Sequence, residues 1–131
     1  MAEETLVESL VLDSIKLVEE LDKQGDAPTN ALWYFSSDAD EWLFLVAGRT
    51  FDGLLPQNQI QAYEKVGRAI ANAGFYSLNI GDVKPVRTDD PILVATKDVV
   101  TTRPDAVVRA HFRGNVFNGI FVKEMLVLRA A

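Results

Sequence analysis

The fold class of this chain follows most directly from residues 106–129, whose sequence is AVVRAHFRGNVFNGIFVKEMLVLR. Two runs rich in aromatic and aliphatic residues, 106–117 and 120–129, flank the dipeptide Asn118-Gly119. These two residues tolerate the positive φ angles of a two-residue hairpin turn. The stretch therefore predicts a closing antiparallel hairpin.

A second hairpin is predicted at residues 31–47, where strands at 31–36 and 42–47 flank an acidic loop. Both strands are apolar on both faces, which is typical of strands that are covered on both sides. Helices of the same chain or a second subunit could supply that cover. In the second case the aromatic side chains would anchor an interface; these candidates are Trp33, Tyr34, Phe35 and Trp42.

Helical periodicity is clearest at residues 3–24, where apolar side chains occupy one half of the helical wheel and mostly charged ones the other. A second helix is predicted at 56–73, ending before Gly74. Residues 75–80 are predicted as a third strand and 81–89 as a loop. Asp90 followed by proline predicts a short capped helix over 91–98, with a strand as the alternative.

The predicted element order is α-β-β-α-β-α-β-β. Two hairpins among about five strands favour a mainly antiparallel or mixed sheet, packed by two longer helices and one short helix. The 131 residues are 48% hydrophobic and 24% charged, which suits a single globular α+β domain over residues 1–131.

Composition excludes several kinds of site. The chain has no cysteine and one histidine, so it has no disulfide framework, thiolate zinc site or two-histidine metal site. We expect no cofactor and no metal. The net charge of -6 opposes general attraction to nucleic acid. The acidic start and the short apolar runs predict a cytoplasmic protein without a membrane partner.

Charge is polarised along the sequence. Residues 1–81 hold thirteen acids and five bases, whereas residues 82–131 hold six acids and eight bases. Alternation in the predicted hairpin places Arg109, His111 and Arg113 on one strand face. Such a row can bind a carboxylate, a phosphate or an acidic partner, and Lys84 and Arg87 could close over it from the loop. A bulge at Arg113-Gly114 would remove Arg113 from the row.

Evidence for catalysis is weak. A hydroxyl nucleophile for His111 could come only from distant positions such as Ser77, Thr101 or Thr102, and no Gly-x-Ser-x-Gly motif is present. The acids of the 37–41 loop lack the spacing of an EF-hand and suit a turn.

Two functional hypotheses remain. The leading one is a non-catalytic protein-interaction module that associates with itself as a homodimer, or with another protein. The alternative is a small-molecule binding protein or modest enzyme that takes an anionic ligand on the face of Arg109, His111 and Arg113.

Overall fold

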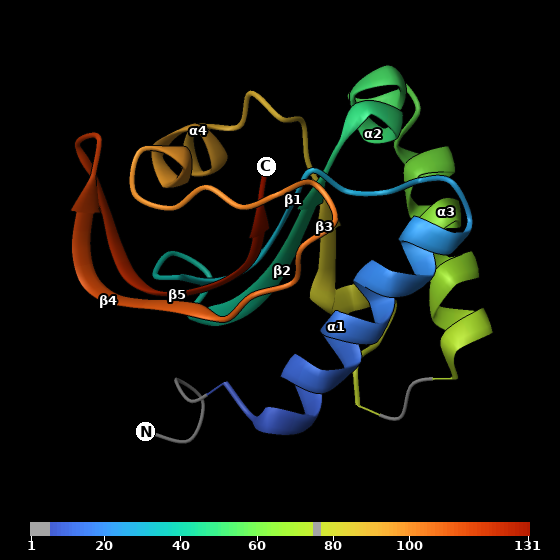
Figure 1. The fold of residues 1–131 in the computed structure, drawn as a ribbon, viewed down its shortest axis with the longest axis horizontal. Helices are drawn as coiled ribbons and strands as arrows, with labels where there is room; N and C mark the ends of the chain where they lie inside the picture. The colour runs from blue at the N-terminus through green and yellow to red at the C-terminus, as the bar shows by residue number, and fades with distance from the viewer. Residues whose placement is uncertain (1–5, 75–76) are drawn as a thin grey trace.

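The computed structural model describes residues 6–74 and 77–131. Its elements follow the predicted α+β order, with one short helix added (Figure 1). The bounds are α1 Glu8–Lys23, β1 Asn30–Ser36, β2 Glu41–Ala47, α2 Arg49–Leu54, α3 Gln59–Ala73, the 3-10 turn η2 Ile80–Asp82, β3 Val83–Pro85, α4 Pro91–Lys97, β4 Ala110–Phe117 and β5 Ile120–Ala130. Within the described ranges, no helix combines the length and the apolar character needed to cross a membrane.

The five strands form one mixed sheet in the order β3-β2-β1-β5-β4. Strand β3 pairs parallel with β2, and the other three ladders are antiparallel. The predicted hairpin at 31–47 forms the β1–β2 ladder, in which Trp33 pairs with Phe44. Strand β1 is central because its other edge pairs with β5.

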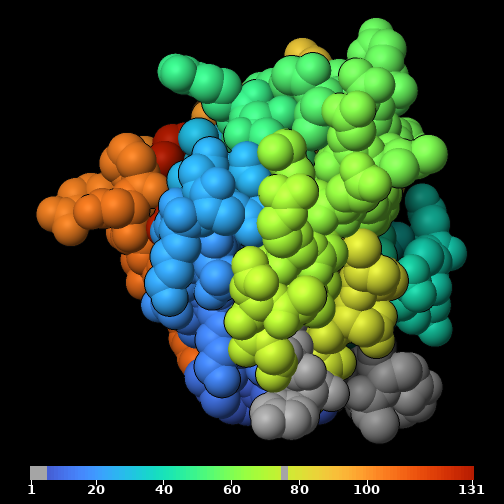
Figure 2. Space-filling model, turned by 90° about the vertical axis from the view of Figure 1, so that its right-hand side faces the viewer, coloured from blue at the N-terminus to red at the C-terminus, as the bar shows by residue number. Residues whose placement is uncertain are grey.

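Helices of the same chain cover both faces of β1. Figures 1 and 2 show α1 and α3 side by side on one face, while α4 lies on the other. Trp33 belongs to the apolar cluster under α1 and α3, and its neighbour Leu32 belongs to the cluster under α4. The apolar character of both faces therefore corresponds to two cores within one chain, the first of the two alternatives that the sequence left open.

The third strand lies outside the predicted segment. Residues 77–80 contain no strand, and residues 75–76 lie outside the described residues. Strand β3 instead comes from the predicted loop and places Val83, Lys84 and Pro85 beside β2. It forms the edge of the sheet, where a proline is tolerated because one side of the strand needs no ladder partner.

The helix predicted at 56–73 begins at Gln59, and residues 48–55, for which the sequence predicted a connection without a helix, contain α2. Phe51 anchors α2 to the apolar cluster under α1 and α3, where its side chain is fully buried. The segment predicted as helix or strand at 91–98 is the helix α4. The Asp90 carboxylate accepts a hydrogen bond from the Ile92 amide, and Pro91 is the first helical residue.

The β4–β5 hairpin turns at Asn118 and Gly119, whose φ angles are 51° and 81°, as the two-residue turn requires. Gly114 also has a positive φ, 62°, but the register of the ladder is the same on either side of it. Val122 and Met125 are three residues apart but belong to the same core cluster. The end of the hairpin therefore turns toward the second cluster and rises beside α4 (Figure 1).

A fully buried arginine connects the two ends of the described chain. The ladder between β1 and β5 has a register shift, after which Arg129 pairs with Ala31. The Arg129 guanidinium donates two hydrogen bonds to the Asp22 carboxylate of α1, at 2.9 and 3.0 Å. It also donates to the carbonyl oxygens of Pro28 and Ala106. One side chain thus joins α1, the start of β1, β5 and the segment before β4.

Candidate functional site

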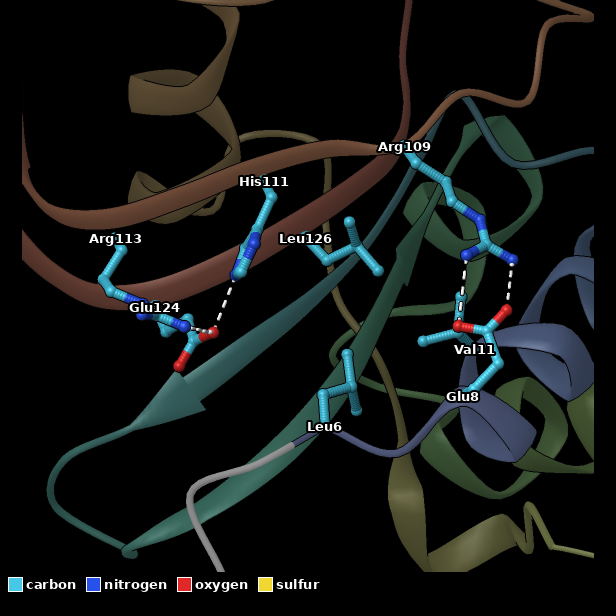
Figure 3. Close-up of a pocket in the computed structure, with 8 residues that line it drawn as sticks. All are labelled: Leu6, Glu8, Val11, Arg109, His111, Arg113, Glu124 and Leu126. Carbon is cyan, nitrogen blue, oxygen red and sulfur yellow. Dashed lines mark hydrogen bonds and ion pairs between the residues drawn. The ribbon is translucent and has the colours of Figure 1, made fainter. Parts of the chain in front are cut away.

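A pocket of about 270 Å³ lies between the first turns of α1 and the β4–β5 hairpin. We call the hairpin face that borders this pocket the outer face. Figure 3 shows charged side chains at two sides of the pocket and leucine side chains between them. The lining residues are Leu6, Glu8, Val11, Arg109, His111, Arg113, Glu124 and Leu126.

The three residues of the predicted cationic row all line this pocket. His111 pairs with Leu126 and Arg113 pairs with Glu124 in the β4–β5 ladder, so both pairs lie on the outer face. The ladder keeps its register across Arg113 and Gly114, so no bulge removes Arg113 from the row. Arg109 precedes β4 by one residue and continues the alternation toward α1.

Arg109 forms a bidentate ion pair with Glu8. Its Nη1 and Nη2 atoms donate to the two carboxylate oxygens at 3.2 and 2.9 Å. The hydrogen bond from Arg109, which outweighs the opposing effect of burial, lowers the pKa of the Glu8 carboxyl, and the same hydrogen bond raises the pKa of Arg109. Both shifts favour the charged forms, so the carboxylate and the guanidinium are charged at neutral pH. Both side chains are exposed to solvent.

Glu124 holds the other side of the pocket. One of its carboxylate oxygens, Oε2, lies 2.7 Å from His111 Nε2 and 3.1 Å from Arg113 Nη2. The Glu124 side chain is only 17% exposed, compared with 63% for Glu8. Glu124 is therefore held by two neighbours on the sheet, while Glu8 extends from the start of a helix.

The floor of the pocket is apolar. Leu126 lies in Figure 3 between the two charged groups, with Leu6 facing it across the opening. Val11 adds a nearly buried side chain from α1. Among the described lining residues, the positive charges of the two arginines balance the negative charges of the two glutamates. The pocket therefore combines an apolar surface with cationic groups that are already paired.

Two lining carboxylates were not predicted from the sequence. Glu124 could have been found, because a two-residue turn at 118–119 fixes the register and places it opposite Arg113. Glu8 could not, since its contact with Arg109 depends on how α1 packs across the sheet. The aliphatic side chains of the floor are indistinguishable in sequence from other core residues.

Lys84 and Arg87 do not join the row, contrary to the prediction. Lys84 is in β3, which forms the edge of the sheet opposite to β4. Arg87 follows β3 and donates to the carbonyl oxygens of Asp52 and Leu55, at 3.1 and 3.2 Å. Strands β2 and β1 lie between β3 and the β5 residues that line the pocket.

Two of the aromatic interface candidates lie inside the chain. Trp33 and Phe35 are each 1% exposed, and Trp33 Nε1 donates to Ser14 Oγ at 2.9 Å. These two rings are therefore unavailable to a partner, contrary to the prediction. Tyr34 and Trp42 are partly buried and keep some accessible surface.

The described residues contain no group of three or more His, Asp or Glu side chains placed to hold a metal ion. The hydroxyls of Thr101 and Thr102 donate to the carbonyl oxygens of Lys97 and Arg103 and do not line the pocket. No protein-family model, curated protein or solved structure matches this chain. Its function is therefore inferred from the site itself.

Proposed function

We propose that this protein is a non-catalytic binding module for a small anionic ligand, which it holds in the pocket between α1 and the β4–β5 hairpin. The observation that carries the proposal is the convergence of Arg109, His111 and Arg113 on one pocket with an apolar floor. Ligand pockets offer apolar surface together with polar groups that orient the ligand, and here Leu6, Val11 and Leu126 supply the apolar part. Guanidinium groups recognise carboxylates and phosphates through paired hydrogen bonds.

The lining supports binding better than catalysis. The eight lining residues among those that the structure describes contribute no hydroxyl, thiol or lysine side chain that could act as a nucleophile. His111 contacts Glu124, but a histidine and a carboxylate without a third reacting group do not complete a nucleophilic site. The ligand would thus be held and released unchanged.

The proposal is tested by titrating isotopically labelled protein with benzoate and with phenyl phosphate while recording amide chemical shifts. We expect shifts at the start of α1 and on β4 and β5. The double variant Arg109→Gln/Arg113→Gln should weaken binding of the better probe by about tenfold or more, because it removes both guanidinium charges that line the pocket. Both side chains are exposed, so the variant should remain folded.

The control is Lys84→Gln/Arg87→Gln, which also removes two positive charges but at the opposite edge of the sheet. This variant should keep the wild-type affinity. An equal loss of affinity in both variants, or the absence of pocket shifts with either probe, would show that the outer face is not the binding site.

Self-association remains a second candidate function. Val116 and Phe121 form a cross-strand pair and are 65% and 58% exposed. Exposed apolar side chains of this kind often mark contact surfaces. If a second copy covers them, Phe121→Ser should raise the dimer dissociation constant by about tenfold. Sedimentation at high micromolar concentration measures this, and a monomeric wild-type protein would exclude the idea.

A further inference from the structure

The Glu8–Arg109 pair already shows how Arg109 can hold a carboxylate. Both terminal nitrogens of the guanidinium donate to the two oxygens of one carboxylate group, at 3.2 and 2.9 Å. This fork arrangement is the one in which an arginine binds a free carboxylate. Glu8 therefore occupies the position in which a ligand carboxylate would bind.

The two carboxylates of the pocket differ in how firmly they are held. Glu8 is 63% exposed and receives its hydrogen bonds from Arg109, which is 45% exposed. Glu124 is 17% exposed and receives contacts from both His111 and Arg113. Exposed ion pairs contribute little to stability because water solvates the separated charges well. Glu8 can thus leave its partner at small cost, whereas Glu124 stays in place.

We propose that the ligand is an amphiphilic monocarboxylate that exchanges with Glu8 on Arg109. This inference rests on the proposed function and names the ligand class for the same pocket. The ligand carboxylate takes the two hydrogen bonds of Arg109, and Glu8 turns into solvent. The apolar part of the ligand lies on Leu6, Val11 and Leu126, and the fixed group of His111, Arg113 and Glu124 closes the far side.

Charge and size set the limits of this class. The exchange replaces one carboxylate by another, so a monoanion leaves the charge balance of the pocket unchanged. A dianion such as a phosphate monoester would add a second negative charge near Glu8 and Glu124. An apolar cavity of about 150 Å³ holds benzene, so a pocket of about 270 Å³ has room for one ring and a carboxylate.

The decisive variant is Glu8→Gln, which removes the internal competitor. We expect it to bind benzoate about two- to fivefold more tightly than the wild-type protein, a gain that matches the small stabilisation of an exposed ion pair. Benzamide has the shape of benzoate without its charge, so the substitution should leave its binding unchanged. Wild-type protein should bind benzoate more tightly than phenyl phosphate. Amide chemical shift titrations measure all five affinities.

Glu20→Gln is the matched control. Glu20 is also on α1 and also pairs with an exposed cation, Lys23, but does not line the pocket. It should leave benzoate binding unchanged. If wild-type protein binds benzoate at the pocket and Glu8→Gln does not tighten binding, or if phenyl phosphate binds at least as tightly as benzoate, the exchange is wrong while the proposed function stands. If neither probe binds at the pocket, the proposed function itself fails.

Discussion

Replacing Trp33 by alanine is expected to lower the free energy of unfolding by about 3–5 kcal/mol. The indole is 1% exposed, and its ring centroid lies 5.1 Å from that of Phe44 on the neighbouring strand. Truncation would remove this packing and leave a cavity under α1. Urea denaturation monitored by circular dichroism measures the change, which should appear as a lower midpoint with a similar slope.

Two further variants separate the causes of that loss. Trp33→Phe keeps a ring but leaves the buried Ser14 hydroxyl without its indole donor, so we expect a smaller loss of about 1–2 kcal/mol. Phe121→Ala changes an aromatic residue that is 58% exposed and should shift stability by less than about 0.5 kcal/mol. A Trp33→Ala protein as stable as the wild type but altered in subunit number would instead return Trp33 to an interface role.

Replacing Arg129 by methionine is expected to lower the free energy of unfolding by about 3 kcal/mol. The guanidinium is fully buried and makes four hydrogen bonds, two of them to Asp22. Methionine fills part of the same space but leaves the carboxylate and the carbonyl oxygens of Pro28 and Ala106 without a donor. Because the Asp22 side chain is one-third exposed, water limits the loss to the lower end of the range for buried pairs.

The comparison for Arg129 is Arg103→Met. Arg103 forms an ion pair with Asp105 at 3.7 Å, but both side chains are more than 80% exposed. Exposed pairs contribute about 0–1 kcal/mol, so this variant should unfold close to the wild-type urea midpoint. Equal losses in the two variants would show that burial of Arg129 is not what makes its contacts matter.

Local signals in the sequence were enough to predict most elements of this fold. The turn at Asn118-Gly119 and the cap at Asp90 depend on residues within a few positions of one another, and both form as predicted. The apolar periodicity of residues 3–24 also identifies α1, although the helix begins only at Glu8, after the non-helical residues 6–7, and residues 1–5 lie outside the described ranges. In each case the interactions that define the element are local, so the sequence pattern contains them.

Strand β3 shows where this reasoning fails. Three residues, one of them a proline, carry no periodicity, and they are extended only because β2 offers a free edge. Residues 77–80 are part of the apolar run that predicted a strand. There the backbone amides of Ser77 and Leu78 instead donate to the Asp13 carboxylate of α1. Both outcomes depend on tertiary contacts that a local pattern does not contain.

The candidate site also contains a part that local sequence patterns predict and a part that they do not. Strand alternation predicts the row of Arg109, His111 and Arg113, since neighbours at a spacing of two share a face. The partners that neutralise the row are a carboxylate across the hairpin and one from α1, about a hundred residues away in sequence. The row was therefore predictable, but its charge balance was not.

The central position of β1 also has a consequence during synthesis on the ribosome. Leu32 pairs with Val127, so one edge of β1 has no partner until most of the 131 residues have been translated. Pairing between such distant segments folds slowly, because a long loop must close first. An open, apolar strand edge can meanwhile pair with other chains. We therefore expect the nascent chain, more than the finished protein, to be prone to aggregation.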